Sequence, residues 1–198
     1  MDTKDRIIEA AYECFSEKGF LGTTTREIAS KAGISEVTLF RYFNNKESLF
    51  EAVLIKKSIL EDLDKLGKNV KEMPLEELLE YLSFRTYQLM RDKKKFIKII
   101  LSEIHGYPVK VISAYENFTK KLHEGFEKAL SPYREELKTD LPLKVVAQFF
   151  LGAIFSYFLT YEVFLNREAK EDTLKKELGT FVSILLEGLK GGKDAKIS

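Results

Sequence analysis

The chain of 198 residues carries 44% hydrophobic and 32% charged side chains, which supplies a core and excludes an intrinsically disordered protein. Its formal net charge of +1 argues neither for nor against a nucleic-acid partner, so any basic footprint has to be local. The one cysteine, Cys14, excludes an intramolecular disulfide and a cysteine-based zinc site within one chain, and we expect it to be a small buried hydrophobe.

Two helices are predicted before residue 34. The first begins at Thr3, which can cap it, and ends at Gly19, a natural helix stop. Its apolar side chains recur at spacings of three and four and form one buried stripe: Ile7, Ile8, Ala11, Cys14 and Phe15. The second helix opens with the capping-box pattern Thr-x-x-Glu at Thr24 and Glu27 and ends at Gly33.

The rest of the chain is predicted to be helical as well. Ser35 caps a third, short helix that runs from Glu36 to about Phe43, and a long fourth helix is expected from Lys46 to about Leu66, with Gly67 as its end. Further helical segments are expected at about residues 74–90, 94–104, 108–130, 142–165 and 170–190. The sequence therefore predicts an all-α fold of about nine helices, without strands or internal repeats.

Residues 24–43, TTREIASKAGISEVTLFRYF, place two short helices around a tight turn at Gly33 and Ile34. Isolated helices below ~12–15 residues are marginal, so both have to pack on the first and fourth helices. In the third helix Leu39 and Phe43 point inward, while the opposite face mixes hydrogen-bonding and apolar groups, as reading of the major groove requires. This arrangement is typical of a helix-turn-helix DNA reader.

Three motifs in residues 5–55 follow one known pattern: FxxKGF at residues 15–20, TTxxIAxxAGIS at residues 24–35 and TLFRYFxNKExL at residues 38–49. With the amphipathic first helix, they make the sequence resemble the TetR family of bacterial transcriptional regulators. The resemblance implies a helix-turn-helix DNA-binding domain over residues 1–46. It also implies a helical domain for effector binding and dimerisation over residues 47–198.

The resemblance further implies DNA contacts, with base reading by residues 36–38 and a phosphate held by the lysine that starts the fourth helix. The implied positions are Thr25, Arg26, Glu36, Val37, Thr38, Phe40, Arg41, Tyr42 and Lys46. Ser35 joins them because the N-terminus of the third helix offers backbone N–H donors that suit phosphate.

Two of these positions depart from the family pattern. Glu36 stands where a basic or amide side chain is common, and its carboxylate is unfavourable near phosphate, although it can accept a hydrogen bond from cytosine N4. Arg41 replaces a common aromatic or histidine and adds a compensating positive charge. Residues 1–50 hold seven basic and eight acidic residues, net −1, so we expect few phosphate contacts per subunit, a need for dimerisation and a moderate salt dependence.

The region from residue 75 to 165 is rich in aromatic side chains, most of which have to be core. Packed helices with large, polar-tipped aromatics often leave an apolar cavity, and the resemblance implies a small lipophilic effector in it. The candidate lining residues are Phe84, Tyr87, Met90, Ile100, Ile104, Tyr115, Phe118 and Phe155. A filled core without a ligand is the alternative.

The last two predicted helices have the pattern of a dimer interface. Residues 145–159 are hydrophobic nearly all round, which suggests a second buried face, and Gly152 and Ser156 allow close helix approach. A twofold homodimer would place two reading helices about one DNA turn apart and select a palindromic operator.

The sequence therefore predicts a ligand-responsive transcriptional regulator, a repressor released from its operator when an effector shifts the fourth helix. Activator action is also compatible with the sequence. A dimeric helical ligand-binding protein without operator function is the alternative, favoured only by Glu36.

An enzyme is not expected, because no nucleophile–base pair, phosphate-binding loop or metal-ligand spacing is present, and His105 and His123 are not four positions apart as a pair of metal ligands on one helix would be. No cofactor and no metal are expected. The first residues do not resemble a signal peptide, and polar residues interrupt the apolar stretch 145–165, so we expect a cytoplasmic protein without a membrane partner.

Overall fold

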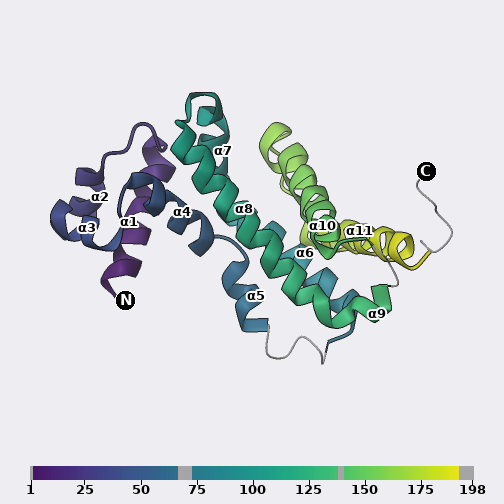
Figure 1. Ribbon diagram of the computed structural model, residues 1–198. Helices are drawn as coiled ribbons and strands as arrows, with labels where there is room; N and C mark the ends of the chain where they lie inside the picture. The colour runs from purple at the N-terminus through teal and green to yellow at the C-terminus, as the bar shows by residue number, and fades with distance from the viewer. Residues whose placement is uncertain (1, 67–72, 138–140, 192–198) are drawn as a thin grey trace. The chain divides into compact units, whose positions relative to one another are not determined.

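A computed structural model of the chain describes residues 2–66, 73–137 and 141–191 (Figure 1). Within these ranges the chain is helical and contains no strand, which confirms the all-α prediction. The helices group into two compact units, the first built from residues 1–58 and 93–120 and the second from residues 59–92 and 121–198. Helix α8 contributes residues to both units.

The first unit contains the N-terminal helices together with a later hairpin. Its elements are α1 (Thr3–Lys18), α2 (Thr25–Lys31), α3 (Glu36–Tyr42), α4 (Lys46–Lys56), α7 (Lys94–Glu103), the 3-10 turn η2 (Ile104–Gly106) and the first half of α8 (Val109–Leu130). Helix α1 packs against α2, α4 and α7, and α2 packs against α3. The predicted boundary between residues 46 and 47 separates a DNA-binding domain from an effector domain. The packing units do not test such a functional division, so the boundary stays a prediction.

Local capping sets the ends of the short helices largely as the sequence predicts. Thr24 and Glu27 form a complete capping box at α2, and the Ser35 hydroxyl caps α3 by accepting the Thr38 N–H at 3.1 Å. Gly19 ends α1 with a positive φ of 74°. The predicted cap Thr3 is wrong, because the preceding residue, Asp2, accepts the N–H of the third helical residue at 2.8 Å.

The prediction of one continuous fourth helix is also wrong. Helix α4 ends at Lys56, and α5 (Leu60–Leu66) starts after a break. The break arises at Ser58, whose backbone N–H and hydroxyl both bond to the Ile55 carbonyl, at 3.2 and 2.7 Å. Bonds to a residue three positions back replace the regular bond to the fourth position back and interrupt the helix. The predicted end at Gly67 lies outside the described residues.

The core of the first unit is an aromatic cluster that joins α1, α4 and α7. The Phe50 ring lies 5.6 Å from that of Phe15, 5.2 Å from that of Phe20 and 6.4 Å from that of Phe96. The predicted buried stripe of α1 is confirmed, since all five of its residues are buried, including Cys14. Burial raises the pKa of the Cys14 thiol, which suits a packing role rather than a reactive one.

The second unit is a separate helical core. Its elements are α5, α6 (Leu75–Asp92), the second half of α8, η3 (Ser131–Tyr133), α9 (Arg134–Leu137), α10 (Leu143–Phe158), the π-helical turn η4 (Leu159–Phe164) and α11 (Glu171–Gly191). Helix α6 packs against α10 and α11. The carboxylate of Glu162 in η4 is fully buried there, and it accepts a hydrogen bond from the Tyr87 hydroxyl at 3.0 Å.

Helix α10 and the turn η4 together form a continuous apolar helix, Leu143–Phe164. Its length and mean hydropathy of 1.6 match those of a membrane span, although its sequence is interrupted by polar residues. The core helix of a soluble protein matches these values as well, so they are weak evidence for a span. Its buried side chains, among them Phe150, Ile154 and Phe158, pack in the core of the second unit.

The two glycines with positive φ should differ in their tolerance of a side chain. A Cβ at Gly19 would lie 2.2 Å from a carboxylate oxygen of Glu103, whereas a Cβ at Gly33 would meet nothing within 4 Å. We expect Gly33→Ala to lower the free energy of unfolding by about 1 kcal/mol through backbone strain alone. Gly19→Ala should lower it by roughly 3 kcal/mol, because its φ of 74° and ψ of 177° lie in a region almost confined to glycine and because the Glu103 carboxylate would have to move away from the added Cβ. Urea denaturation measures both losses, and equal losses would contradict the stronger constraint at Gly19.

Candidate nucleic-acid interface

Helix α3 divides into an inner and an outer face as the sequence predicts. Leu39 is fully buried and Phe43 nearly so, and both pack in the core of the first unit. The outer face carries Val37, Phe40 and Tyr42, which are 75%, 44% and 46% exposed. Apolar side chains this exposed on so short a helix favour an interface over a core role for Phe40.

The N-terminus of α3 presents a small hydroxyl cluster. The Ser35 and Thr38 hydroxyls lie 2.8 Å apart and share a hydrogen bond, and the Ser35 oxygen also accepts the Thr38 backbone N–H. This cap fixes the first turn of the helix whose outer side chains are the predicted base readers. Contact of these residues with DNA stays a prediction.

Two of the predicted DNA contacts bond to each other. The Thr25 hydroxyl, in the first turn of α2, donates a hydrogen bond to the Glu36 carboxylate, in the first turn of α3. Because its donor belongs to α2 and its acceptor to α3, eleven positions later, this bond joins the two helices of the motif directly. The carboxylate also lies at a helix N-terminus, where negative charge is stabilised. Glu36 therefore has a structural partner within the motif.

Lys46, the predicted phosphate holder, is also engaged within the protein. Its ammonium donates to the carbonyl oxygens of Phe20 and Thr23, both at 2.8 Å, and lies 4.2 Å from the centre of the Phe20 ring. Burial lowers the pKa of this ammonium. Two of its three donors are thus directed at the loop between α1 and α2, which leaves one for an outside acceptor.

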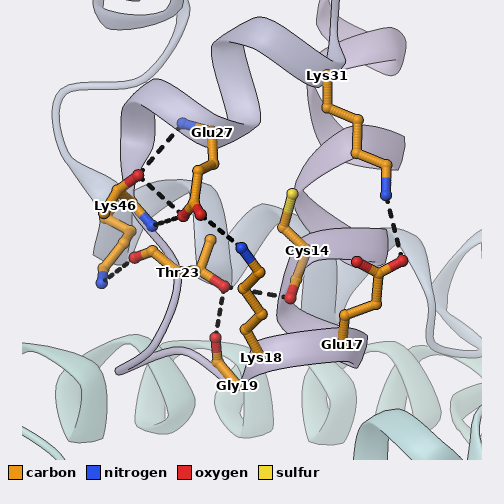
Figure 2. A network of polar contacts seen from close by, with 9 residues as sticks. Cys14, Glu17, Lys18, Gly19, Thr23, Glu27, Lys31 and Lys46 are labelled. Carbon is orange, nitrogen blue, oxygen red and sulfur yellow. Dashed lines mark hydrogen bonds and ion pairs between the residues drawn. The ribbon is translucent and has the colours of Figure 1, made fainter.

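The other lysines around α2 are held in ion pairs (Figure 2). Lys18 lies 2.5 Å from Glu27, and Lys31 lies 2.9 Å from Glu13. The Lys18 ammonium, followed by the N–H and hydroxyl of Thr24, lowers the pKa of Glu27 to about 2. These lysines flank a shallow groove of about 430 Å³, whose lining is Cys14, Glu17, Lys18, Arg26, Glu27, Ser30 and Lys31.

Two cations close to the reading helix have no such partner. Arg26 and Arg41 are exposed, and within the described part of the chain neither guanidinium forms a hydrogen bond or an ion pair. Both guanidinium groups therefore remain available for phosphate. A guanidinium suits this role because its charge is permanent and its donors match phosphate oxygens.

The predicted ligand-lining residues are distributed over both units. Phe84, Tyr87, Met90 and Phe155 belong to the second unit, where Tyr87 is fully buried and the Lys175 ammonium lies 5.0 Å from the Phe84 ring centre. The others belong to the first unit, and two of them are about half exposed: Ile100, Ile104, Tyr115 and Phe118. A common effector cavity stays a prediction.

The predicted dimer surface leaves an apolar stripe uncovered on the second unit. Val145 and Phe149 of α10 are 48% and 63% exposed, and Gly152 and Ser156 continue the same stripe. On α11, Ile184 is 58% exposed. Large apolar side chains this open along two helices are typical of a face that meets another protein surface.

One functional candidate was not predictable from the sequence. The Glu103 carboxylate, at the end of α7, accepts hydrogen bonds from the backbone N–H groups of Phe20 and Leu21, at 2.8 and 3.3 Å. Glu103 lies more than eighty positions from both partners in the sequence. The two donors are backbone N–H groups, which every residue except proline has, so no sequence pattern marks them. Among the described residues, no group of three or more metal-ligating side chains is brought together.

This geometry defines the class of the protein, a helix-turn-helix protein with a helical second unit, and comparison with known proteins gives the family. The model for the bacterial regulatory proteins of the tetR family matches residues 7–53. The HTH-type transcriptional regulator YvkB of Bacillus subtilis, itself named as uncharacterized, is 32% identical over 171 residues, which cover 79% of this chain and 82% of YvkB. The chain belongs to the TetR family of bacterial transcriptional regulators.

Two further relatives extend the similarity over nearly the whole chain. The negative transcriptional regulator IcaR of the icaADBC biofilm operon, from Staphylococcus aureus, is 22% identical over 188 residues, covering 93% of this chain and 99% of IcaR. The solved structure of FadR from Bacillus subtilis, in complex with stearoyl-CoA, superimposes with a TM-score of 0.68 at 20% identity, covering 95% of this chain and 98% of FadR. At that identity the structural likeness shows the fold.

The bond between Thr25 and Glu36 predicts energetic coupling between the two helices. We expect Thr25→Val and Glu36→Ala each to lower the free energy of unfolding by about 1 kcal/mol, and the double variant to lose about 0.5–1 kcal/mol less than their sum. Chemical denaturation of the four proteins gives the coupling. Val37→Ala, on the same turn and 75% exposed, serves as a near-neutral control. Additive losses would show that the hydrogen bond contributes nothing in solution.

Proposed function

We propose that the protein is a ligand-responsive transcriptional repressor that binds a palindromic operator as a homodimer and leaves it when a small lipophilic effector binds. The observation that carries the proposal is the outer face of α3, where exposed Val37, Phe40 and Tyr42 accompany the unpaired Arg41. Apolar groups that can contact thymine methyls, beside a permanent cation for phosphate, are the chemistry of a major-groove reader.

The proposed interface assigns each predicted contact a role. Val37 and Thr38 read bases, Phe40 and Tyr42 contact sugar or thymine methyls, and Arg26 and Arg41 neutralise phosphates. Ser35 and the free donor of Lys46 add phosphate contacts at the ends of α3 and α4, while Thr25 and Glu36 hold the two helices together. Residues 1–46 thus act as the DNA-binding domain and residues 47–198 as the domain for effector binding and dimerisation.

Repression and effector release rest on the relatives. IcaR is named as a negative regulator of its operon, which supports a repressor. FadR was solved with stearoyl-CoA, which supports an effector with a long apolar chain. The aromatic side chains proposed to line the cavity suit such a molecule. The role involves no catalysis and requires no cofactor, and a regulator of this kind acts in the cytoplasm, where the DNA lies.

The alternative of a ligand-binding protein without operator function loses its main support. Glu36 was the feature that favoured it, because a free carboxylate would face DNA phosphates. That carboxylate accepts the Thr25 hydroxyl instead, so its presence has a reason that does not conflict with DNA binding. No other observation favours this alternative.

Selection of random duplexes by the purified protein, at a stated salt concentration, tests operator binding. We expect a palindrome, and we expect Thr38→Ala combined with Tyr42→Ala to abolish its selection. Tyr81→Ala is the matched control, because Tyr81 on α6 is 41% exposed, close to the 46% of Tyr42. With Arg26, Arg41 and the remaining donor of Lys46 on phosphates in each protomer, the logarithm of affinity should fall with the logarithm of salt concentration with a slope of about −5. Recovery of unrelated sequences by the unmodified protein would refute specific reading.

The exposed stripe of α10 predicts how the dimer forms. Phe149→Glu places a charge on that stripe and should convert the dimer to a monomer, because burying an unpaired carboxylate is strongly unfavourable. Operator affinity should then fall by about a hundredfold or more, since each protomer reads only one half-site. Sedimentation velocity and operator titration measure both effects, with Tyr81→Glu as the control. A Phe149→Glu protein that stays dimeric would place the interface elsewhere.

A further inference from the structure

The loop between α1 and α2 is held by two opposite charges from distant parts of the first unit. On its N–H side, the two carboxylate oxygens of Glu103 accept from Phe20 at 2.8 Å and from Leu21 at 3.3 Å. On its carbonyl side, the Lys46 ammonium donates to Phe20 and Thr23, both at 2.8 Å. Phe20 is therefore bonded to an anion through its N–H and to a cation through its C=O.

The surroundings leave this arrangement little freedom. The Tyr107 hydroxyl donates to Glu103 at 3.2 Å, and its ring packs against that of Phe20 at a centroid distance of 6.0 Å. A Cβ on Gly19 would collide with the Glu103 carboxylate, so the carboxylate fits against bare backbone. The Thr23 hydroxyl bonds to the carbonyls of Cys14 and Gly19 and closes the loop on itself, as Figure 2 shows.

The loop leads directly into the reading head, which we define as α2 and α3. Thr24, the cap of α2, follows Thr23, and α3 is joined to α2 by the bond between Thr25 and Glu36. Glu103, which bonds to the other end of this loop, is the last residue of α7. The turn η2 and then α8 follow it, and α8 is the helix that contributes residues to both units. Charge-assisted hydrogen bonds are short and directional, so they fix position more tightly than apolar contacts do.

We infer that Glu103 is a positioning residue for operator binding, which fixes the reading head relative to α7 and α8 by holding the loop between α1 and α2. This inference rests on the proposed function, because its main consequence is read on DNA. In a dimer, a fixed distance between the two reading heads fits operators with one particular number of base pairs between their half-sites. A loosened loop lets each head adapt, so the protein accepts operators whose half-sites are one base pair closer or farther apart.

A purely structural role for Glu103 predicts a different result. If the carboxylate only stabilised the fold, its removal would lower the affinity for all operators in proportion and leave the preferred spacing unchanged. A positioning role lowers the preference for the correct spacing itself. The ratio of affinities between the selected operator and variants with one base pair added or removed therefore separates the two roles.

The test compares Glu103→Gln, Glu103→Ala and Tyr107→Phe with the unmodified full-length protein. Ser102→Ala is the matched control, since the neighbouring Ser102 is exposed and its hydroxyl bonds only to the Ile99 carbonyl of its own helix. Each protein is assayed for its thermal midpoint, for hydrogen exchange of the Phe20 and Leu21 amides and for operator affinity at three half-site spacings.

We expect exchange at Phe20 and Leu21 to rise about tenfold in Glu103→Ala, as for the loss of one charge-assisted hydrogen bond. The preference for the correct spacing should fall by a similar factor, with smaller changes in Glu103→Gln and Tyr107→Phe and none in Ser102→Ala. Unchanged exchange, or an unchanged spacing ratio despite weaker binding, would overturn the inference. If the unmodified protein selects no operator, the proposed function fails, and the exchange rates still decide whether Glu103 holds the loop.

Discussion

The reading surface exists because a few inner side chains hold two very short helices in place. Helices α2 and α3 have seven residues each, well below the ~12–15 at which an isolated helix becomes stable. Ile28 and Leu39 are fully buried in the cluster that contains Phe15 and Phe50, and this burial supplies the stability that the helices lack. The exposure of the outer face of α3 thus depends on the packing of its inner face.

A second constraint is that most of the nearby positive charge is used inside the protein. Lys18 and Lys31 pair with glutamates, and Lys46 binds two carbonyls, so these lysines hold the helices and the loop together. In the described part of the chain Arg26 and Arg41 have no internal partner, which suits the phosphate contacts proposed for them. If the protein binds DNA as proposed, so few cations per protomer make its non-specific attraction to DNA weak, and specific affinity has to come from base contacts and from joining two half-sites in a dimer. In that proposal the apolar stripe on α10 and the outer face of α3 depend on each other in function.

The sequence predicted features determined by neighbouring residues and missed those determined by distant ones. The capping box of Thr24, the Ser35 cap and the division of α3 into two faces follow from spacings of three or four residues, and all are confirmed. The break at Ser58 was missed because a serine is compatible with a helix until its hydroxyl bonds to the backbone. Glu103 and Lys46 bond to backbone groups, which are the same whatever side chain the partner residue carries. No sequence pattern therefore reveals these contacts, and only the three-dimensional structure shows them.

The early end of α4 changes how a signal can reach the reading head. A fourth helix that ran unbroken from Lys46 to Leu66 would act as a lever, but α4 stops at Lys56. The hairpin of α7 and α8 belongs to the same unit as the reading head, and α8 also contributes to the second unit. The Glu103 carboxylate connects α7 to the loop between α1 and α2 through two hydrogen bonds. Because hydrogen bonds weaken steeply with misalignment, a small shift of α7 would release the loop rather than bend it. A clamp of this kind favours two discrete states over a graded response, which is the behaviour that the proposed release from an operator would need.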